Sequence, residues 1–364
     1  MSELNNMKFR AANETDRKEW NTVVEQSNSA EIYHLYEWGE LLEKTYNIKV
    51  LRLVAEKDDT IVSILPYVYF NNTLFGRKIV SLPFADIGGC CTLDEFRNLS
   101  GALIKKLIKI AKQQKVNFLE FRSLEESAKD LHAFGFIKGF QAFTYRIYTK
   151  ISHDEIWKNY GKKIRHNIRK MGKIGLNIKE AGHERDLYKY YEIYLKRMKD
   201  FGTPPAPFAF WSNMWSIFYP KGMMKLIFSV FDGREIAGFT ALLFKRRLYF
   251  ILNVSLKKFW KFYGLNELLF DWYIRYACEN RYEFVDFGRT REGTGVQRFK
   301  EKGWGVQRIP LNTYYLFLRG KKKNPLEIAL QPDTNIYSRA WKRFIPIFLT
   351  PTLGHLIRKK LGDV

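Results

Sequence analysis

The two halves of the chain carry the same order of secondary-structure patterns, and this repeat restricts the fold more than any other feature of the sequence. The first half predicts four segments: a hairpin over 51–70, a strand over 77–84, a helix over 99–116 and a strand over 118–123. The second half predicts a hairpin over 225–244, with its turn at Asp232–Gly233, then a strand over 247–255, a helix over 266–281 and a strand over 284–289. A hairpin followed by a strand, a covering helix and a returning strand is an α+β unit, here used twice.

This repeat sets the expected domain boundaries. A chain of 364 residues with 46% hydrophobic residues can fill two cores. We expect a first domain over 1–150, a second domain with a basic linker helix over 151–320, and a basic tail over 321–364. Inside the second domain we expect a tyrosine-rich helix over 186–198. The three prolines of 201–208 predict an irregular loop.

The charge balance indicates an anionic partner. The chain has 61 Lys and Arg against 38 Asp and Glu, a formal net charge of +23. Such a field attracts phosphates, nucleic acid, anionic sugars or an acidic membrane surface, although solubility alone would also account for it.

Neither the cysteines nor the N-terminus indicates secretion or a metal site. Cys90, Cys91 and Cys278 lack the spacing of a zinc site, and neither a secretory signal nor a transmembrane run is present. We therefore expect a cytoplasmic protein with reduced thiols, and any membrane contact at the inner face.

A helix predicted within GKKIRHNIRKMGK, residues 161–173, separates charge from apolar residues. From Trp157 to Lys173 the chain contains seven cations and no acid. One face collects the cations Lys162, Arg165, Arg169 and Lys173, and the opposite face collects Ile164, Ile168 and Met171. The basic face predicts a site for phosphates or carboxylates, or else a face that is merely solvated.

The loop after the last predicted strand carries five cations between Arg289 and Lys302. Lys300 follows Phe299, and an aromatic neighbour can fix a lysine stem. A lysine held in this way could stabilise the oxyanion of an acyl-transfer intermediate. The alternative is that Lys300 only ties the loop to Asp286 or Glu301. Asp286 itself could take the proton of an attacking amine, or only orient Arg289.

The segment 257–266 joins a strand to a helix, where helix N-terminal amides can hold an anion. We expect Tyr263 and Asn266 to border a donor cleft, or Asn266 simply to cap the helix. A phosphate-cradling acyl-CoA loop is matched only in part, by Lys261, Gly264 and Asn266. The sequence contains neither a Ser-His-Asp order, a nucleophile elbow, a Walker loop nor a metal-ligand cluster, which disfavours covalent and metal-dependent mechanisms.

Several of these segments together resemble a known family. They are GKKIRHNIRKMGK, FGTPPAPFAFW, DGREIAGFTALLF, FYGLNELLFDWYI and VDFGRTREGTGVQRFKEKGWG. The set is similar to the FemAB-like branch of the acetyltransferase (GNAT) superfamily, over most of the chain and most clearly over 155–310. The tail from Asn335 to Gly362 resembles a subgroup associated with exosortase and exopolysaccharide loci.

The resemblance implies two tandem acetyltransferase-like domains. The best-known members move an amino acid from aminoacyl-tRNA onto a peptidoglycan precursor. The family's lysine that binds the acyl donor falls on Lys300. Its strand-end motif falls on Asp286, Gly288 and Arg289, and its basic helix on Lys162, Arg165 and Arg169. The coiled-coil arm of some bridge-forming members is absent.

These observations predict a transferase that moves an acyl or aminoacyl group to an amine of a cell-envelope glycan or a lipid-linked precursor. The acyl donor would be acyl-CoA or aminoacyl-tRNA, and the acceptor an anionic nucleotide- or lipid-linked sugar. The alternatives are an acyl-CoA-dependent N-acetyltransferase of a small amino sugar and a non-catalytic binder of RNA or another anionic polymer.

The tail from Arg339 to Leu361 mixes six large apolar residues, from Trp341 to Leu349, with cations at both ends. Such a segment could lie on an anionic membrane and bring the enzyme to a lipid-linked acceptor. Docking of the tail on the first domain is the alternative.

Overall fold

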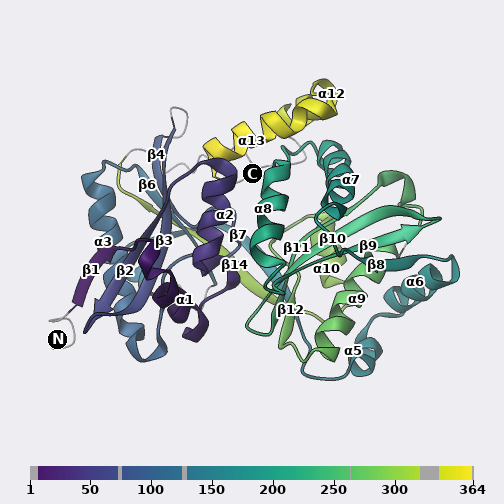
Figure 1. The fold of residues 1–364 in the computed structure, drawn as a ribbon, viewed down its shortest axis with the longest axis horizontal. Helices are drawn as coiled ribbons and strands as arrows, with labels where there is room; N and C mark the ends of the chain where they lie inside the picture. The colour runs from purple at the N-terminus through teal and green to yellow at the C-terminus, as the bar shows by residue number, and fades with distance from the viewer. Residues whose placement is uncertain (1–6, 73–75, 125–128, 263, 320–335, 363–364) are drawn as a thin grey trace. The chain divides into compact units, whose positions relative to one another are not determined.

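The computed structural model describes residues 7–72, 76–124, 129–262, 264–319 and 336–362 (Figure 1). The chain forms two compact units. The first comprises Met1–Ala142, Pro310–Gln331 and Leu356–Val364, and the second comprises Phe143–Ile309 and Pro332–His355.

The first unit contains a sheet in the order β1-β2-β3-β4-β6-β14. Its strands are β1 (Met7–Ala11), β2 (Val50–Lys57), β3 (Thr60–Asn72), β4 (Gly76–Ser81), β5 (Cys91–Thr92, paired with β3), β6 (Phe118–Leu124) and the end of β14 (Gln307–Phe317). Its helices are α1 (Arg17–Gln26), α2 (Tyr36–Tyr46), α3 (Ser100–Gln113) and α4 (Lys129–Ala133). Strand β4 runs parallel to β6, and β14 pairs with β6 in antiparallel fashion.

Strand β7 (Ile137–Tyr148) begins in the first unit and ends in the second. The sheet of the second unit has the order β7-β12-β11-β10-β9-β8. Its other strands are β8 (Asn177–Glu180), β9 (Met224–Phe231), β10 (Arg234–Phe244), β11 (Arg247–Ser255), β12 (Phe284–Asp286) and the short β13 (Thr290–Arg291). Its helices are α5 (His153–Asn159), α6 (Lys162–Lys173), α7 (Asp186–Phe201), α8 (Phe208–Phe218), α9 (Leu265–Glu279), α10 (Gly295–Glu301), α12 (Ile336–Phe344) and the start of α13 (Thr350–Leu361).

Strand β10 shows how the sheet of the second unit is covered on both faces. Adjacent residues of a strand point to opposite faces. Gly238 lies against the ring of Tyr190 on α7, whereas Phe239 packs on Phe270 and Tyr273 of α9. The continuous burial of β10 from Ile236 onward follows from these two layers of helices.

The predicted repeat is confirmed in its elements. The hairpins β2–β3 and β9–β10, the covering helices α3 and α9, and the returning strands β6 and β12 all form where the sequence predicts them. The tyrosine-rich helix is α7, and residues 203–207 after it are irregular, as their prolines require. Helix α8 and strand β14 had no predicted counterpart. Strand β14 was not predicted, because the sequence repeat gives no sign that residues after Ile309 return to the first unit.

Candidate functional site

The parallel strands β11 and β12 of the second unit pair only over Arg247–Tyr249 and Phe284–Asp286, where β12 ends. We call the point where this pairing stops the divergence of β11 and β12. Strand β11 then continues to Ser255, and Ile251 is an extra residue that interrupts its register with β10. An extra residue of this kind leaves the regular ladder. The carboxyl-terminal half of β11 therefore has an edge facing the divergence, and Ile251 is only half-buried there.

Helix α9 begins beside this edge without a side-chain cap from the described residues. Its N-cap is Gly264, with φ +123°. A Cβ atom there would come within 2.6 Å of the carbonyl oxygen of Asn167, so the position requires glycine. The alternative that Asn266 caps the helix is wrong, because Asn266 lies inside the first turn and its Oδ1 accepts a 3.2 Å hydrogen bond from Asn253 Nδ2. Tyr263 lies outside the described residues.

Asp286 ends β12 as a buried carboxylate that accepts three hydrogen bonds. Its Oδ2 accepts a 2.8 Å hydrogen bond from Arg146 Nε, and both side chains are buried. Its Oδ1 accepts from the Thr144 hydroxyl and, at 2.9 Å, from the Gly288 amide. These contacts fix the strand end and the turn that follows it.

Lys300 is buried and ties that turn to α10. Its Nζ donates to the carbonyl oxygen of Phe287, to that of Gly288 at 3.0 Å and to the Thr290 hydroxyl at 2.8 Å. An ammonium group has three donors, and all three acceptors belong to the turn after β12. Three uncharged oxygens of the turn thus contribute to holding the ammonium. An ion pair of Lys300 with Asp286 or Glu301 stays a prediction.

The other two predicted residues of this loop differ in burial. Arg289 is half-buried. Phe299 packs edge-on against Phe270 and Trp304, with ring centroids 5.2 and 6.0 Å away. Phe299 therefore belongs to the core that supports Lys300.

The predicted basic helix is confirmed as α6, with its apolar side buried. Lys162 and Arg169 are exposed, and Arg165 is half-buried. On the inner side, Asn167 Nδ2 donates a 2.9 Å hydrogen bond to Glu267 in the first turn of α9. The exposed cations of α6 therefore lie on a helix that contacts the start of α9.

A further cation near the end of β11 was not predicted. The guanidinium of Arg197 on α7 lies 3.7 Å from the ring centre of Phe201 and 4.1 Å from that of Trp260. Burial lowers the pKa of Arg197 to about 10, so it stays charged at neutral pH. Trp260 in turn donates from Nε1 to Ser255 Oγ at 3.2 Å. Phe201 lies one turn along α7 from Arg197, whereas Trp260 is distant in the sequence, so its contact with Arg197 could not be predicted.

A largely buried His–Asp pair was also not predicted from the sequence. His153 Nε2 lies 2.7 Å from Asp271 Oδ1, where α5 meets α9. Burial raises the pKa of the neighbouring Tyr160, with the charge of Asp271 adding to it. This pair lies at the base of α5, and a lone histidine at a helix start gave no signal for it.

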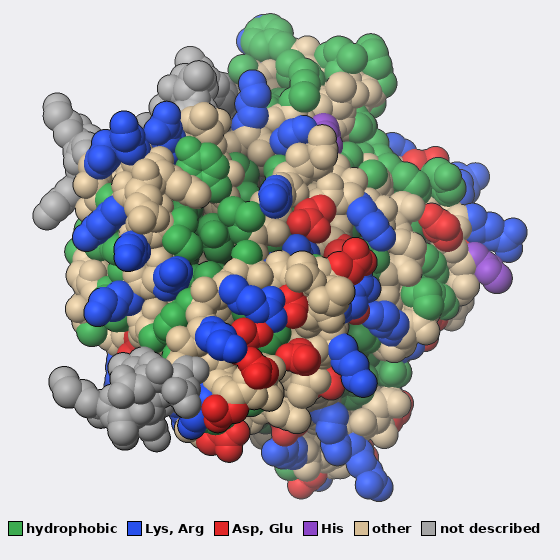
Figure 2. Space-filling view, turned by 60° about the vertical axis from the view of Figure 1, so that its left-hand side comes forward, with side chains coloured by type: hydrophobic (Ala, Val, Ile, Leu, Met, Phe, Trp, Pro, Cys, Tyr) green, Lys and Arg blue, Asp and Glu red, His purple; other side chains and the backbone are tan. Residues whose placement is uncertain are grey.

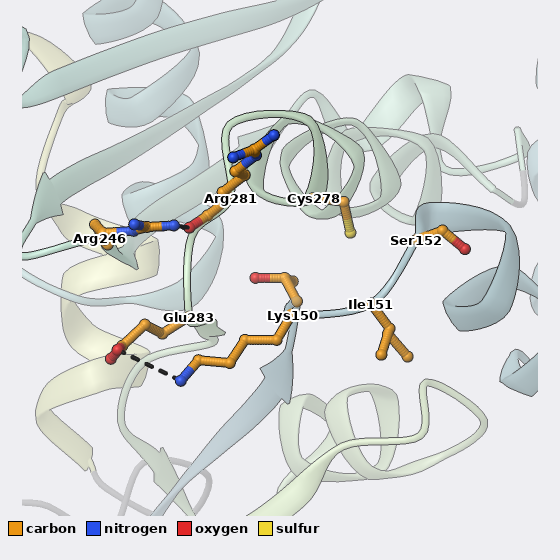
Figure 3. A pocket seen from close by; sticks show the side chains of 8 residues that line it. Lys150, Ile151, Ser152, Arg246, Cys278, Arg281 and Glu283 are labelled. Carbon is orange, nitrogen blue, oxygen red and sulfur yellow. Dashed lines mark hydrogen bonds and ion pairs between the residues drawn. The ribbon is translucent and has the colours of Figure 1, made fainter.

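One pocket of about 520 Å³ lies in the second unit, at the end of the sheet where β12 begins (Figure 3). It is lined by Thr149, Lys150, Ile151, Ser152, Arg246, Cys278, Arg281 and Glu283. Lys150 and Glu283 form an ion pair of 3.6 Å, and burial raises the pKa of the Cys278 thiol to about 11. The pocket contains none of the predicted site residues, and its thiol is protonated at neutral pH.

Residues 158–301 match the family described as an acetyltransferase (GNAT) domain. This range spans α6 to α10 and includes the divergence of β11 and β12, the start of α9 and Lys300. No curated protein matches the chain.

Solved structures match nearly the whole chain. The crystal structure of FemX has a TM-score of 0.65 and 14% identity, covering 85% of this chain and 97% of that one. The structure of L-PGS from Bacillus licheniformis has a TM-score of 0.58 and 12% identity, covering 90% and 97%. A tandem GNAT protein from the clavulanic acid biosynthesis pathway has a TM-score of 0.56 and 9% identity, covering 86% and 99%. The fold is that of two tandem GNAT domains. Its α+β class is as predicted.

The described residues offer neither a metal centre nor a membrane span. They contain no group of three or more His, Cys, Asp or Glu side chains that could hold a metal ion. Within the same residues, every helix is too short or too polar to cross a bilayer.

Proposed function

We propose that this protein is an N-acyltransferase that moves an acyl or aminoacyl group from an activated donor to an amine of a cell-envelope molecule. The amine nitrogen attacks the donor carbonyl carbon, the bond from that carbon to the donor's sulfur or oxygen breaks, and the amine loses one proton. The observation that carries the proposal is the divergence of β11 and β12 beside the start of α9, inside the segment that matches a GNAT domain.

The start of α9 is suited to the phosphates of the donor. A helix N-terminus presents amides that lack partners within the helix and the positive end of its dipole. Because Gly264 supplies no side chain, a phosphate can approach these amides closely. Asn266 and Asn253 border the same edge and can donate to the donor's polar groups.

The edge of β11 is suited to the reacting carbonyl. The extra residue Ile251 leaves the ladder with β10, and we propose that its amide donates to the oxyanion of the tetrahedral intermediate. The oxyanion role predicted for Lys300 requires its Nζ to exchange one of its three acceptors for the substrate oxygen. Asp286 is buried and already accepts three hydrogen bonds, which makes it a poor acceptor of the amine proton. We therefore propose that Asp286 mainly positions the strand end.

The basic face of α6 is suited to a phosphate-bearing substrate. Lys162 and Arg169 are exposed on a helix that contacts the start of α9 through Asn167, and Arg165 lies half-buried between them. Arg169 also lies over the ring of Trp157 at 5.6 Å, which limits its motion. The net charge of +23 favours the same kind of partner.

The relatives support an acceptor in the cell envelope. One matching structure is that of a putative lysylphosphatidylglycerol synthetase domain, with a TM-score of 0.56 and 13% identity, and another is FemX. The former is named for a product that joins an amino acid to a lipid. We propose aminoacyl transfer to a lipid-linked or anionic envelope precursor. The link to exopolysaccharide loci and the choice between acyl-CoA and aminoacyl-tRNA stay predictions.

The substitution Asn266→Asp tests the donor site. A carboxylate in the first turn of a helix stabilises the fold, commonly by about 0.5 kcal/mol, but it repels a phosphate bound at the same amides. We expect the variant to unfold at the same or higher temperature and to bind its donor at least fivefold more weakly. Calorimetric titrations with acetyl-CoA and, separately, with bulk aminoacyl-tRNA measure that affinity. Asn177→Asp, on the edge strand β8, makes the same charge change away from the site and serves as the control.

The pattern of binding also chooses between functions. Binding of acetyl-CoA but not tRNA, weakened by Asn266→Asp, would place the chain with acyl-CoA-dependent N-acetyltransferases. The reverse pattern would favour aminoacyl transfer. RNA binding that is insensitive to Asn266→Asp but lost in Lys162→Glu/Arg169→Glu would instead support a non-catalytic binder of anionic polymers.

A further inference from the structure

The segment after α12 is held firmly on the second unit. Lys199 on α7 donates from Nζ to the carbonyl oxygen of Trp341 at 2.7 Å and to that of Ile345. The Trp341 side chain is buried, and Ser338 Oγ donates to the Phe201 carbonyl oxygen at 3.2 Å. Helix α12 is therefore packed on α7, and this contact fixes where the residues after α12 leave the second unit.

This fixed segment nevertheless presents apolar side chains to solvent. We define the apolar ridge as Phe344, Ile347, Phe348 and Leu349, whose exposed fractions are 69%, 39%, 75% and 42%. The ridge ends at Thr350, which is buried and donates from its hydroxyl to the Ile347 carbonyl oxygen at 2.6 Å. Folding normally buries side chains of this size, so a compact group of them facing water marks an interaction surface.

The surroundings of the ridge are basic. Residues 334–362 contain six Lys and Arg and no acid. Lys342 and Arg343 are exposed directly before the ridge, and the Arg343 guanidinium lies 5.4 Å from the ring centre of Phe344. Figure 2 shows apolar side chains at the upper end of the molecule with Lys and Arg beside them, at the height where Figure 1 draws α12.

We propose that the apolar ridge, with Lys342 and Arg343, is a docking surface for an anionic lipid bilayer. Aromatic and aliphatic side chains that stand out from the surface can enter the acyl boundary of a bilayer, while neighbouring cations bind lipid phosphates. The exposure of Phe344 and Phe348 fits a bilayer better than a protein partner. A protein surface would need a hollow that matches these side chains, whereas a bilayer adapts to their shape. In so far as this surface brings the enzyme to a lipid-linked acceptor, it rests on the proposed function.

Vesicle co-sedimentation of the full chain tests the surface. We expect the wild type to sediment with phosphatidylcholine vesicles that contain phosphatidylglycerol, and at least fivefold less with phosphatidylcholine alone. Phe344→Ser/Phe348→Ser should lower binding at least tenfold, because it removes the side chains that enter the bilayer. Lys342→Glu/Arg343→Glu should abolish the preference for the anionic lipid. The control Ile137→Ser/Ile151→Ser changes two exposed apolar residues outside the ridge, of 46% and 45% exposure, and should leave binding unchanged.

Three outcomes overturn the proposal. They are a wild type that does not sediment with anionic vesicles, a ridge variant that binds as well as the wild type, and a wild-type dimer in light scattering that the ridge substitutions dissociate. The last outcome would make the ridge a contact between two copies of the chain. Thermal unfolding of each variant checks the fold. Donor titration of the ridge variant separates the two proposals, because normal donor binding without vesicle binding leaves the transferase intact.

Discussion

The two units use the same pair of parallel strands but treat the ends of those strands differently. In the second unit, the pairing of β11 with β12 stops at Tyr249 and Asp286. Strand β11 ends at Ser255 and α9 begins at Leu265, with the short helix η6 (Lys257–Phe259) between them. In the first unit, β4 pairs with β6 over Lys78–Ser81 and Phe118–Phe121. The chain after β4 then makes a long excursion before α3 begins at Ser100.

In the first unit, residues 85–88 of this segment occupy the space beside the ends of β4 and β6. The Gly88 amide donates to the Arg122 carbonyl oxygen at 3.0 Å, and Arg122 Nη1 donates to the Ala85 carbonyl oxygen at 2.9 Å. A Cβ atom on Gly88 would lie 1.9 Å from the Ser81 carbonyl oxygen, so the segment passes tightly against the end of β4. Ala85 and Ile87 are buried in this segment.

The two units differ beside the strand ends, where the proposed function places the acyl donor in the second unit. In the first unit the backbone of residues 85–88 occupies the place beside the strand ends, whereas in the second unit the corresponding edge of β11 carries half-buried residues. We infer that the repeat has been divided into one structural unit and one unit with the donor site. The following substitutions test that division, beginning with the largest expected effect.

Removing the buried carboxylate at each returning strand should destabilise both units but affect donor binding in only one. Asp286→Ala leaves Arg146 buried without this partner, and Glu120→Ala does the same to Arg122, which lies 3.1 Å from Glu120. Breaking a buried ion pair in this way typically costs about 4 kcal/mol of unfolding free energy. Urea unfolding measures the loss, and hydrogen exchange locates it in each unit.

Only Asp286→Ala should also weaken donor binding in calorimetry. Equal loss of donor affinity in Glu120→Ala would contradict the division. The double substitution Arg146→Met/Asp286→Leu should recover much of the stability but not the donor affinity, because it replaces the pair with apolar side chains while leaving the Gly288 amide without its acceptor.

Displacing residues 85–88 of the first unit from the strand ends should cause the next largest loss of unfolding free energy. Gly88→Ala places a methyl group against the Ser81 carbonyl oxygen, and we expect a loss of about 3 kcal/mol because backbone must move. Hydrogen exchange should rise over residues 82–99. Gly172→Ala, on α6 with open space around it, should instead stabilise the chain by about 0.7 kcal/mol. Unchanged stability in Gly88→Ala would show that the segment is not packed as described.

The sequence predicted the elements of this comparison better than its decisive contacts. Periodicity alone identified the hairpins, the covering helices and the basic face of α6, because each of these depends on residues near one another in the chain. Periodicity could not show that Gly264 is the N-cap of α9, because that role depends on its backbone φ of +123°, which the sequence does not give. Lys300 donates to three uncharged oxygens of the turn, and no charge pattern predicts those contacts.

The contact of Arg197 with Trp260 also joins distant segments. The position of residues 85–88 beside the strand ends of the first unit was equally unpredictable, since residues 82–99 carry no regular pattern that indicates their path. Each of these contacts depends on the tertiary fold, which brings α7 to the loop after β11 and residues 85–88 to the end of β6.

Lys300→Ala should give a smaller loss, about 2 kcal/mol, because hydrogen bonds from a charged donor to Phe287, Gly288 and Thr290 disappear together. Lys300→Met keeps the packed stem and should lose nearly as much. Lys302→Ala, two residues away and exposed, should change stability by less than about 0.5 kcal/mol. Normal stability with a lower turnover in Lys300→Ala would show that this lysine acts on the oxyanion rather than on the turn.

The smallest expected effect concerns two buried tyrosines, one in each unit. Burial, with a hydrogen bond to Glu301, raises the pKa of Tyr145 to about 12, whereas burial alone raises the pKa of Tyr67. A raised phenol pKa means that the folded state holds its proton more tightly than the unfolded state, whose pKa is about 10. The resulting stability is complete below pH 10 and is lost as the pH rises from 10 to 12. Urea midpoints of the wild type should therefore fall more steeply across this range than those of Tyr145→Phe, whose ring cannot ionise.

Tyr67→Phe should alter the slope less, because no carboxylate adds to the effect of burial there. Parallel curves for the wild type and Tyr145→Phe would mean that the phenol is not held against Glu301, and the loop of the second unit would then be less firmly anchored than the filled segment of the first.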